Sequence, residues 1–237
     1  MKVAIMQPYF FPYIGYFSLI ANADRFIVFD TVQFIRHGWI ERNRILHPDR
    51  KVLYIKVPLV SHSRQTLIKD IKINEGAFNW KGRIYDQLVP YRKVAPNFKS
   101  TMDLVKECLE INTTSIVELN VNVLHKICLY IGIDFHYNTL SEMNPELPEI
   151  YEPDEWALYI SKWLGADSYV NPPGGLAFFD RKKYENHGIN LEFIKPELTE
   201  YRQYPGQDFI PELSIIDVLM FNSINQIQGM LSNIHYL

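Results

Sequence analysis

The sequence predicts an α/β fold in which a parallel or mixed β-sheet is flanked by helices. Two short apolar runs, at residues 2–6 and 25–30, have the character of buried strands, and they enclose a segment with helical character at 15–23. This order is a minimal β-α-β unit, for which a right-handed parallel crossover is expected. Strands and helices alternate again after residue 133, so a Rossmann-like sheet with a helical insertion is expected.

The segment after this first unit predicts hairpin strands. Residues 39–73 alternate between apolar and polar positions, which is typical of half-buried strands. We expect strands at 51–57 and 68–73, joined by the polar loop 61–65. A mixed sheet follows from such a hairpin.

A largely helical section is expected at about residues 79–131. The apolar period there is helical, with breaks near Pro96 and at 112–114. Ser115 and Glu118 have the spacing of a capping box, so the longest helix is expected to begin there. The 237 residues as a whole are expected to form a single α/β domain.

The last third of the chain returns to short strands and helices. The expected elements are a strand at 133–137, a loop rich in Pro and Glu at 144–153, a helix at 156–164, and strands at 168–170 and 190–194 with a helix between them.

Charge and composition exclude several classes of function. The net charge of −3 offers no basic field for a nucleic-acid backbone, so no nucleic-acid partner is expected. No run approaches the roughly 20 apolar residues of a membrane span, so no membrane insertion is expected. The apolar N-terminus is interrupted by Pro8, Pro12 and Gly15, unlike that of a signal peptide.

Cys108 and Cys128 lie on apolar helical stripes and are expected to be reduced core residues of a cytoplasmic protein.

The aromatic loop, residues 7–17, directly follows the first strand and is the most distinctive segment. It contains six aromatic residues, two prolines and a glycine. Loops beyond the carboxyl ends of strands hold the ligands of α/β folds, and rings fixed by neighbouring prolines lose little entropy on covering a ligand. The alternative is that these aromatic side chains build a core. The candidate ligand-binding residues are Gln7, Tyr9, Tyr13, Gly15 and Tyr16.

The aromatic loop also resembles the nucleotidylyltransferase-like Rossmann class, which carries a His-x-Gly-His signature at this point. There the glycine lets a nucleotide lie against the helix N-terminus, and the histidines stabilise the transferred phosphoryl group. Here Tyr13 and Tyr16 replace both histidines around Gly15. A neutral phenol cannot supply cationic stabilisation, so the resemblance implies a nucleotide-binding shape, and adenylyl transfer is disfavoured.

A basic segment at residues 36–44 is a second candidate site. In an extended segment Arg42 and Arg44 point to the same face, where two guanidinium groups can bind diphosphate oxygens while Trp39 covers a sugar or base ring. The alternative is a solvated strand with Trp39 as its core anchor. The polar and aromatic residues gathered here are Arg36, His37, Trp39, Arg42, Asn43 and Arg44.

A turn rich in Pro and Gly follows the strand at 168–170. Asn171 precedes two prolines, and Gly174 and Gly175 are free to adopt positive φ and to aim backbone N–H groups at an anion or an oxyanion. An ordinary turn is the alternative.

Two polar residues near the C-terminus are further candidates. Ser214 and Asp217 have the spacing of a helix N-cap and an acidic third position, so Asp217 is expected to be a capping residue or, alternatively, an acid-base group. Asn222 places an amide on an apolar helix, where it needs a hydrogen-bond partner.

Four segments together resemble the WbqC-like family. They are the aromatic loop and the segments at 38–45, 171–175 and 213–222, and they run in order over nearly the whole chain. Members of that family are found mainly in bacterial gene clusters for surface polysaccharides such as O-antigen, so the resemblance implies a pathway. Glu41 departs from the family pattern, in which Asn is commoner.

The resemblance and the residues together favour a transferase that forms an amide on the amino group of a nucleotide-linked amino sugar. The expected donor is an acyl or aminoacyl thioester of coenzyme A or of an acyl carrier protein, and no other cofactor is expected. Direct attack by the amine needs a proton acceptor, for which His37 and Asp30 are candidates, and an oxyanion site, for which the amides of Gly174 and Gly175 are candidates.

Two other functions remain open. One is a non-catalytic module that binds a nucleotide sugar or a glycan precursor, and the other is a Rossmann-type ligase that adenylates a carboxylate with ATP. The seven histidines are scattered without the paired spacing of metal ligands, so no metal site is predicted.

Overall fold

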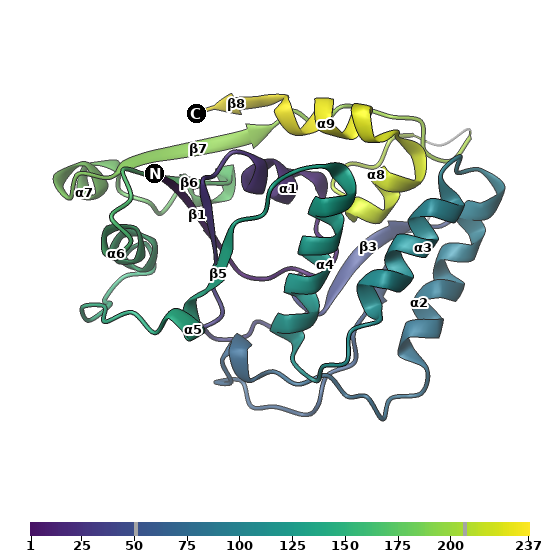
Figure 1. Cartoon of the computed structure of the whole chain (residues 1–237), viewed down its shortest axis with the longest axis horizontal. Coiled ribbons are helices and arrows are strands. Elements are labelled where there is room, and N and C mark those ends of the chain that lie inside the picture. The colour runs from purple at the N-terminus through teal and green to yellow at the C-terminus, as the bar shows by residue number, and fades with distance from the viewer. Residues whose placement is uncertain (50–51, 206–207) are drawn as a thin grey trace.

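The main sheet is mixed in the computed structural model, which describes residues 1–49, 52–205 and 208–237. Among these residues its six strands lie in the order β5-β2-β1-β6-β7-β8 (Figure 1). Neighbouring strands are parallel, except β7 and β8, which are antiparallel. The expected α/β fold is therefore confirmed. The strands are β1 (Lys2–Met6), β2 (Arg25–Val28), β5 (Tyr137–Thr139), β6 (Ser168–Asn171), β7 (Asn190–Pro196) and β8 (Ile234–Tyr236).

The strand order is that of a doubly wound sheet. From β1 the chain moves outward through β2 and β5 to one edge, and it then returns to pair β6 with the other side of β1 before continuing to β7 and β8. Numbered within the sheet, this is the order 3-2-1-4-5-6 of Rossmann-type folds. Because the winding direction reverses between β1 and β6, the carboxyl ends of these strands form the topological switch point, where ligands of such folds bind.

Each face of the sheet has its own hydrophobic core, because side chains alternate along the strands. In β1, Val3 and Ile5 pack into the smaller cluster, and Ala4 between them packs into the larger one. The smaller cluster is covered by α6 (Glu155–Trp163) and α7 (Arg181–Asn186). The larger cluster is covered by the helical section and by α1 (Ile14–Ala21), α8 (Ile215–Phe221) and α9 (Ile224–Ser232) (Figure 1).

The section expected to be helical is helical. Ser115 is the N-cap of its longest helix, and the Ser115 hydroxyl accepts a hydrogen bond from the Glu118 N–H at 3.4 Å. The Glu118 carboxylate accepts from Thr113 instead of reaching back to Ser115, so one half of the expected capping box forms. Cys108 and Cys128 are both buried in this section. Its elements are α2 (Trp80–Leu88), the 3-10 turn η2 (Val89–Lys93), α3 (Phe98–Leu109) and α4 (Ile116–Ile131).

The hairpin forms earlier in the chain than expected. β3 (Arg42–Leu46) and β4 (Val52–Lys56) pair antiparallel, as a separate small sheet. The strand expected at 51–57 is thus present as β4, while Lys51 lies outside the described residues. Its partner is β3, in the basic segment.

The prediction of a strand at 68–73 was wrong. Residues Ile68–Asp70 form a 3-10 turn (η1), and beyond it Lys72 and Ile73 make isolated bridges. Ile68 and Ile71 are both fully buried, and a spacing of three residues suits a 3-10 turn, in which such positions share a face. The spacing of Ile68 and Ile71 therefore follows the repeat of a 3-10 turn and not the alternation of a strand.

In the last third of the chain, the expected strands near 168 and 190 and the helix near 156 agree with β6, β7 and α6. The strand expected at 133–137 lies later, as β5, because Gly132 ends α4 in a left-handed conformation with φ of 72° and the chain must first return to the sheet. The short helix α5 (Leu140–Met143), α9 and β8 were not expected. Within the described ranges, every helix is too short or too polar to cross a bilayer.

Candidate functional site

A cavity of about 930 Å³, called here the main pocket, opens at the carboxyl ends of three neighbouring strands. Met6 ends β1, Asn171 ends β6, and Lys195 and Pro196 end β7, and all four residues line the cavity. The main pocket therefore lies at the topological switch point of the sheet.

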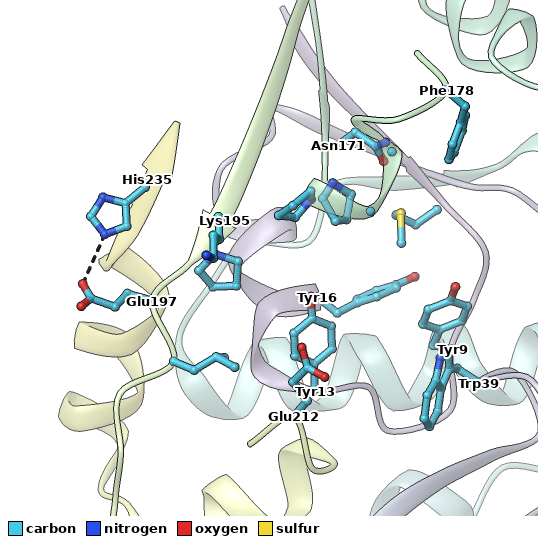
Figure 2. Close-up of a pocket in the computed structure, with 17 residues that line it drawn as sticks. Tyr9, Tyr13, Tyr16, Trp39, Asn171, Phe178, Lys195, Glu197, Glu212 and His235 are labelled. Atoms are coloured by element: carbon cyan, nitrogen blue, oxygen red, sulfur yellow. Dashed lines mark hydrogen bonds and ion pairs between the residues drawn. The ribbon is translucent and has the colours of Figure 1, made fainter. Parts of the chain in front are cut away.

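Aromatic side chains form one wall of the main pocket. Tyr9, Tyr13 and Tyr16 of the aromatic loop line it together with Trp39 (Figure 2). The Tyr16 hydroxyl donates to the Gln7 carbonyl oxygen at 2.7 Å, and the ring centroids of Tyr9 and Tyr16 are 5.4 Å apart, so the loop is tied to the start of α1. Burial raises the pKa of Tyr9, and chiefly burial raises the pKa of Tyr13 to about 12. These phenols therefore stay neutral at physiological pH and can donate hydrogen bonds.

Gly15 allows the Tyr13 ring to lie against the first turn of α1. A Cβ at position 15 would lie 2.3 Å from a carbon of that ring. A larger residue would therefore push Tyr13 out of its place in the wall. Gly15 itself lines neither cavity, and its lack of a side chain serves the close approach of Tyr13.

The turn after β6 lines another side of the main pocket through Asn171, Gly174 and Gly175. Neither glycine uses its freedom to adopt positive φ, because Pro173–Gly175 form a 3-10 turn (η3). The Gly175 N–H donates to the Pro172 carbonyl oxygen at 3.2 Å, so it is not free for an oxyanion. Gly175 is needed for packing instead, since a Cβ there would lie 2.1 Å from the Asn171 amide nitrogen.

Charged and titratable side chains lie at the β7 side of the main pocket. Lys195 is exposed, and within the described residues its ammonium group has no ion-pair partner. His235 faces it across the β7–β8 pair, and His235 Nε2 lies 3.3 Å from Glu197 Oε2 (Figure 2). Sequence reasoning missed all three. The rule that ligands bind beyond strand ends, applied to the strand at 190–194, would have found Lys195 and Glu197, whereas His235 belongs to a strand with no clear sequence signal.

A smaller cavity of about 160 Å³, called here the annex, adjoins the main pocket. Arg44 lines it, and its guanidinium lies 5.4 Å from the Trp39 ring centroid. An Arg44 Nη atom donates to the Glu212 carbonyl oxygen at 2.9 Å and lies 3.9 Å from the Glu212 carboxylate. Four residues line both cavities and lie between them, namely Tyr9, Tyr13, Trp39 and Glu212.

Arg42, His37 and Asp30 are among the candidates of the sequence analysis that line neither cavity. The Arg42 guanidinium lies over the Tyr54 ring at 4.4 Å and donates to the His37 carbonyl oxygen. His37 is exposed, with φ of 62°, and its N–H donates to the Glu41 carboxylate at 2.7 Å. These contacts hold the basic segment together, and they direct Arg42 away from the site.

Asp30, the third of these residues, takes part in hydrogen bonds that hold the fold together. It is buried, and its carboxylate accepts from the backbone N–H of Ser141 at 3.0 Å and from the Ser141 hydroxyl. These bonds fix the start of α5, which directly follows the edge strand β5. Gln7 is likewise absent from the lining of both cavities, although its carbonyl oxygen anchors Tyr16.

The remaining polar candidates are buried and satisfied within the fold. Asn43 lines the annex, but its amide donates to the Phe10 carbonyl oxygen at 3.0 Å. The Asn222 amide donates to the Val218 carbonyl oxygen at 2.9 Å, at the end of α8. Both residues therefore brace the elements around the site.

Asp217 forms a buried network. Ser214 is the N-cap of α8, and Asp217 lies at the third position as expected, but the Asp217 carboxylate accepts from the hydroxyls of Tyr91 at 2.6 Å and Tyr201 at 2.7 Å and from the Gln203 amide at 3.1 Å. Burial raises its pKa to about 6, against the opposing effect of these bonds. It lines neither cavity. No group of three His, Cys, Asp or Glu residues suited to a metal ion occurs within the described ranges.

Comparisons with known proteins agree with the resemblance seen in the sequence. The model of the WbqC-like protein family matches residues 7–229 of the chain. The uncharacterized protein Rv1507c of Mycobacterium tuberculosis is 29% identical over 224 residues, which cover 93% of each chain. No solved structure gives a significant match.

Proposed function

Because the chain belongs to the WbqC-like protein family, we propose that it is a transferase of bacterial surface-polysaccharide biosynthesis that forms an amide on the amino group of a nucleotide-linked amino sugar. The pathway is the one that the family resemblance implies. The reaction is proposed to take place in the cytoplasm, with an acyl or aminoacyl thioester of coenzyme A or of a carrier protein as donor. The position of the main pocket at the topological switch point carries the proposal, since nucleotides bind there in Rossmann-type folds.

The walls of the main pocket suit the three parts of a nucleotide sugar. The rings of Tyr9, Tyr13 and Trp39 offer flat apolar surfaces for a base and a sugar ring. Lys195 offers a cation for the diphosphate, and it has no protein partner to give up within the described residues. The volume of about 930 Å³ lies within the usual range for small-molecule sites.

In the proposed reaction the sugar amine attacks the thioester carbonyl carbon directly. A C–N bond forms and the C–S bond breaks, and a base takes the proton from the attacking nitrogen and passes it to the thiolate, which departs as the free thiol. His235 is the proposed proton acceptor, because an imidazole serves well in this role and the Glu197 carboxylate can orient its ring. The neutral phenols of the aromatic wall are the proposed donors to the oxyanion.

Direct attack predicts that neither cysteine takes part. Burial raises the pKa of the Cys108 thiol to about 12 and also raises that of Cys128, so both stay protonated and unreactive. The double variant Cys108→Ala with Cys128→Ala is expected to lose about 1–3 kcal/mol of unfolding free energy because of the cavities it opens, and to keep its activity. Urea unfolding and a turnover assay below the melting temperature check this. A stable acyl adduct on either cysteine, seen by intact mass spectrometry after incubation with the thioester alone, would refute direct attack.

The function itself is tested by ligand-induced shifts of the melting temperature, followed by mass spectrometry of the products. We expect stabilisation by nucleoside-diphosphate amino sugars and by an acyl thioester, and a new amide when both are present. Stabilisation by the sugar nucleotides without any product would favour a binding module. Stabilisation by ATP with release of pyrophosphate would favour an adenylating ligase.

A further inference from the structure

Glu212 holds a backbone conformation that is unusual for its residue type. Its φ is 56°, in the left-handed region that disfavours residues with a long side chain. The chain just beyond it is fixed at two points, since the Ser214 N–H donates to the Arg44 carbonyl oxygen at 2.8 Å and the Ile215 N–H donates to the Pro12 carbonyl oxygen at 2.8 Å. These bonds tie Glu212 to the aromatic loop and to β3. Strain that is held in this way is characteristic of functional positions.

The conformation presents the Glu212 carboxylate between the main pocket and the annex. Tyr9, Tyr13 and Trp39 are the aromatic residues that line both cavities with it, and Figure 2 shows the carboxylate beside Tyr13. The negative charge of Glu212 contributes, after burial, to the raised pKa of Tyr13, which reflects how near the two groups are. A carboxylate among aromatic rings is a favourable setting for an ammonium group, because both the charge and the ring faces attract a cation.

The carboxylate still has capacity for a cationic ligand. Arg44 makes its hydrogen bond to the Glu212 carbonyl oxygen, and its nearest approach to the carboxylate is 3.9 Å, so in the described part of the chain the carboxylate accepts no hydrogen bond. The Glu212 side chain is 60% exposed, toward space that a ligand can fill. Glu197, the other carboxylate that lines the main pocket, already lies 3.3 Å from His235.

We propose that Glu212, with the rings of Tyr9, Tyr13 and Trp39, binds the free amino group of the sugar in its protonated form and thereby selects amino sugars over their hydroxyl counterparts. This inference rests on the proposed function. Glu212 acts as a specificity-determining residue, since attack on the thioester requires the ammonium group to lose its proton to a separate acceptor.

The test compares matched pairs of ligands. Dissociation constants are measured by calorimetry for UDP-hexoses that carry a free amino group at C2 or at C4 and for the corresponding hydroxyl sugars, with wild type, Glu212→Gln and Glu197→Gln. Wild type is expected to bind one amino sugar about 10- to 100-fold more tightly than its hydroxyl counterpart, the factor typical of a hydrogen bond between charged groups. Glu212→Gln should remove this preference and leave the affinity for the hydroxyl sugar unchanged, and Glu197→Gln should keep the preference.

Other outcomes overturn the inference in distinguishable ways. If wild type binds both members of every pair equally, or if Glu212→Gln keeps the preference, Glu212 does not recognise the amine, although the proposed function can still hold. If wild type binds none of these sugars, the proposed function fails and the inference fails with it. Melting temperatures of the two variants within a few degrees of wild type show that each remains folded.

Discussion

The Lys195→Met variant is expected to bind nucleoside-diphosphate sugars about 10- to 100-fold more weakly than wild type. Among the described residues that line the main pocket, Lys195 carries the only permanent positive charge, and a diphosphate needs a cationic partner to leave water. Methionine keeps the length and apolar stem of the side chain. Because Lys195 is exposed and unpaired there, its loss should change the unfolding free energy by no more than about 0.5 kcal/mol.

Arg42→Met is the matched control, since it removes the same charge from the basic segment. The Arg42 guanidinium is engaged with Tyr54 and the His37 carbonyl oxygen outside both cavities, so its loss should leave the affinity nearly unchanged. Titration calorimetry at physiological ionic strength measures both variants. Equal losses would show that the effect is one of overall charge, and an unchanged affinity in Lys195→Met would move the diphosphate to another site.

The Asp217→Ala variant is expected to lose about 3–5 kcal/mol of unfolding free energy. Removal of the carboxylate leaves the donors of Tyr91, Tyr201 and Gln203 without their buried acceptor. The Tyr91 hydroxyl also accepts from the Leu46 N–H at 2.8 Å, so the network connects α8 to β3. Urea unfolding measures the loss. A change below about 1 kcal/mol would show that the network contributes little to stability.

The same carboxylate predicts a pH dependence with a definite sign. Burial raises the pKa of Asp217 from 3.8 to about 6, so between these values the folded protein binds more protons at this site than the unfolded chain. The part of the stability that depends on protonation of Asp217 is therefore fully present below about pH 4 and is lost as the pH rises through about 6. Asp217→Asn cannot titrate. The difference in unfolding free energy, wild type minus Asp217→Asn, should fall by up to about 3 kcal/mol from about pH 4 to about pH 7, and parallel pH curves would contradict this.

The fold was predictable where local pattern and packing agree. Apolar runs form the strands of the β-α-β unit at 2–30 and the strands near 168 and 190, and both faces of these strands are buried. Their apolar composition is therefore enough to predict them as strands. The segment at 68–73 was not predictable in this way, because η1 packs against α4 and Ile68 and Ile71 are buried outside any strand of the sheets. A short edge strand such as β8 has only three residues, too few for a recognisable sequence pattern, and it forms because it pairs with its neighbour β7.

The sequence predicted only those parts of the site that directly follow a strand in the chain. The aromatic loop and the turn at 171–175 follow buried strands directly, and both line the main pocket. Glu212 is brought to the aromatic loop from about 200 positions away by bonds of Ser214 and Ile215, which no local pattern encodes. Arg42 and Arg44 do lie on one face of β3, as their spacing indicated, but their neighbours Tyr54 and Glu212 decide that Arg44 alone reaches a cavity.

The central claim is that the pocket at the switch point between β1 and β6 binds a nucleotide-linked amino sugar. A crystal structure of the protein with UDP-glucosamine tests it most directly. The expected result is a ligand between the aromatic loop and the turn at 171–175, with its diphosphate at Lys195 and its amino group facing Glu212. A ligand bound elsewhere, for example on the exposed face of β3 and β4 or in the cavity beside α4 that His125 lines, would contradict the claim.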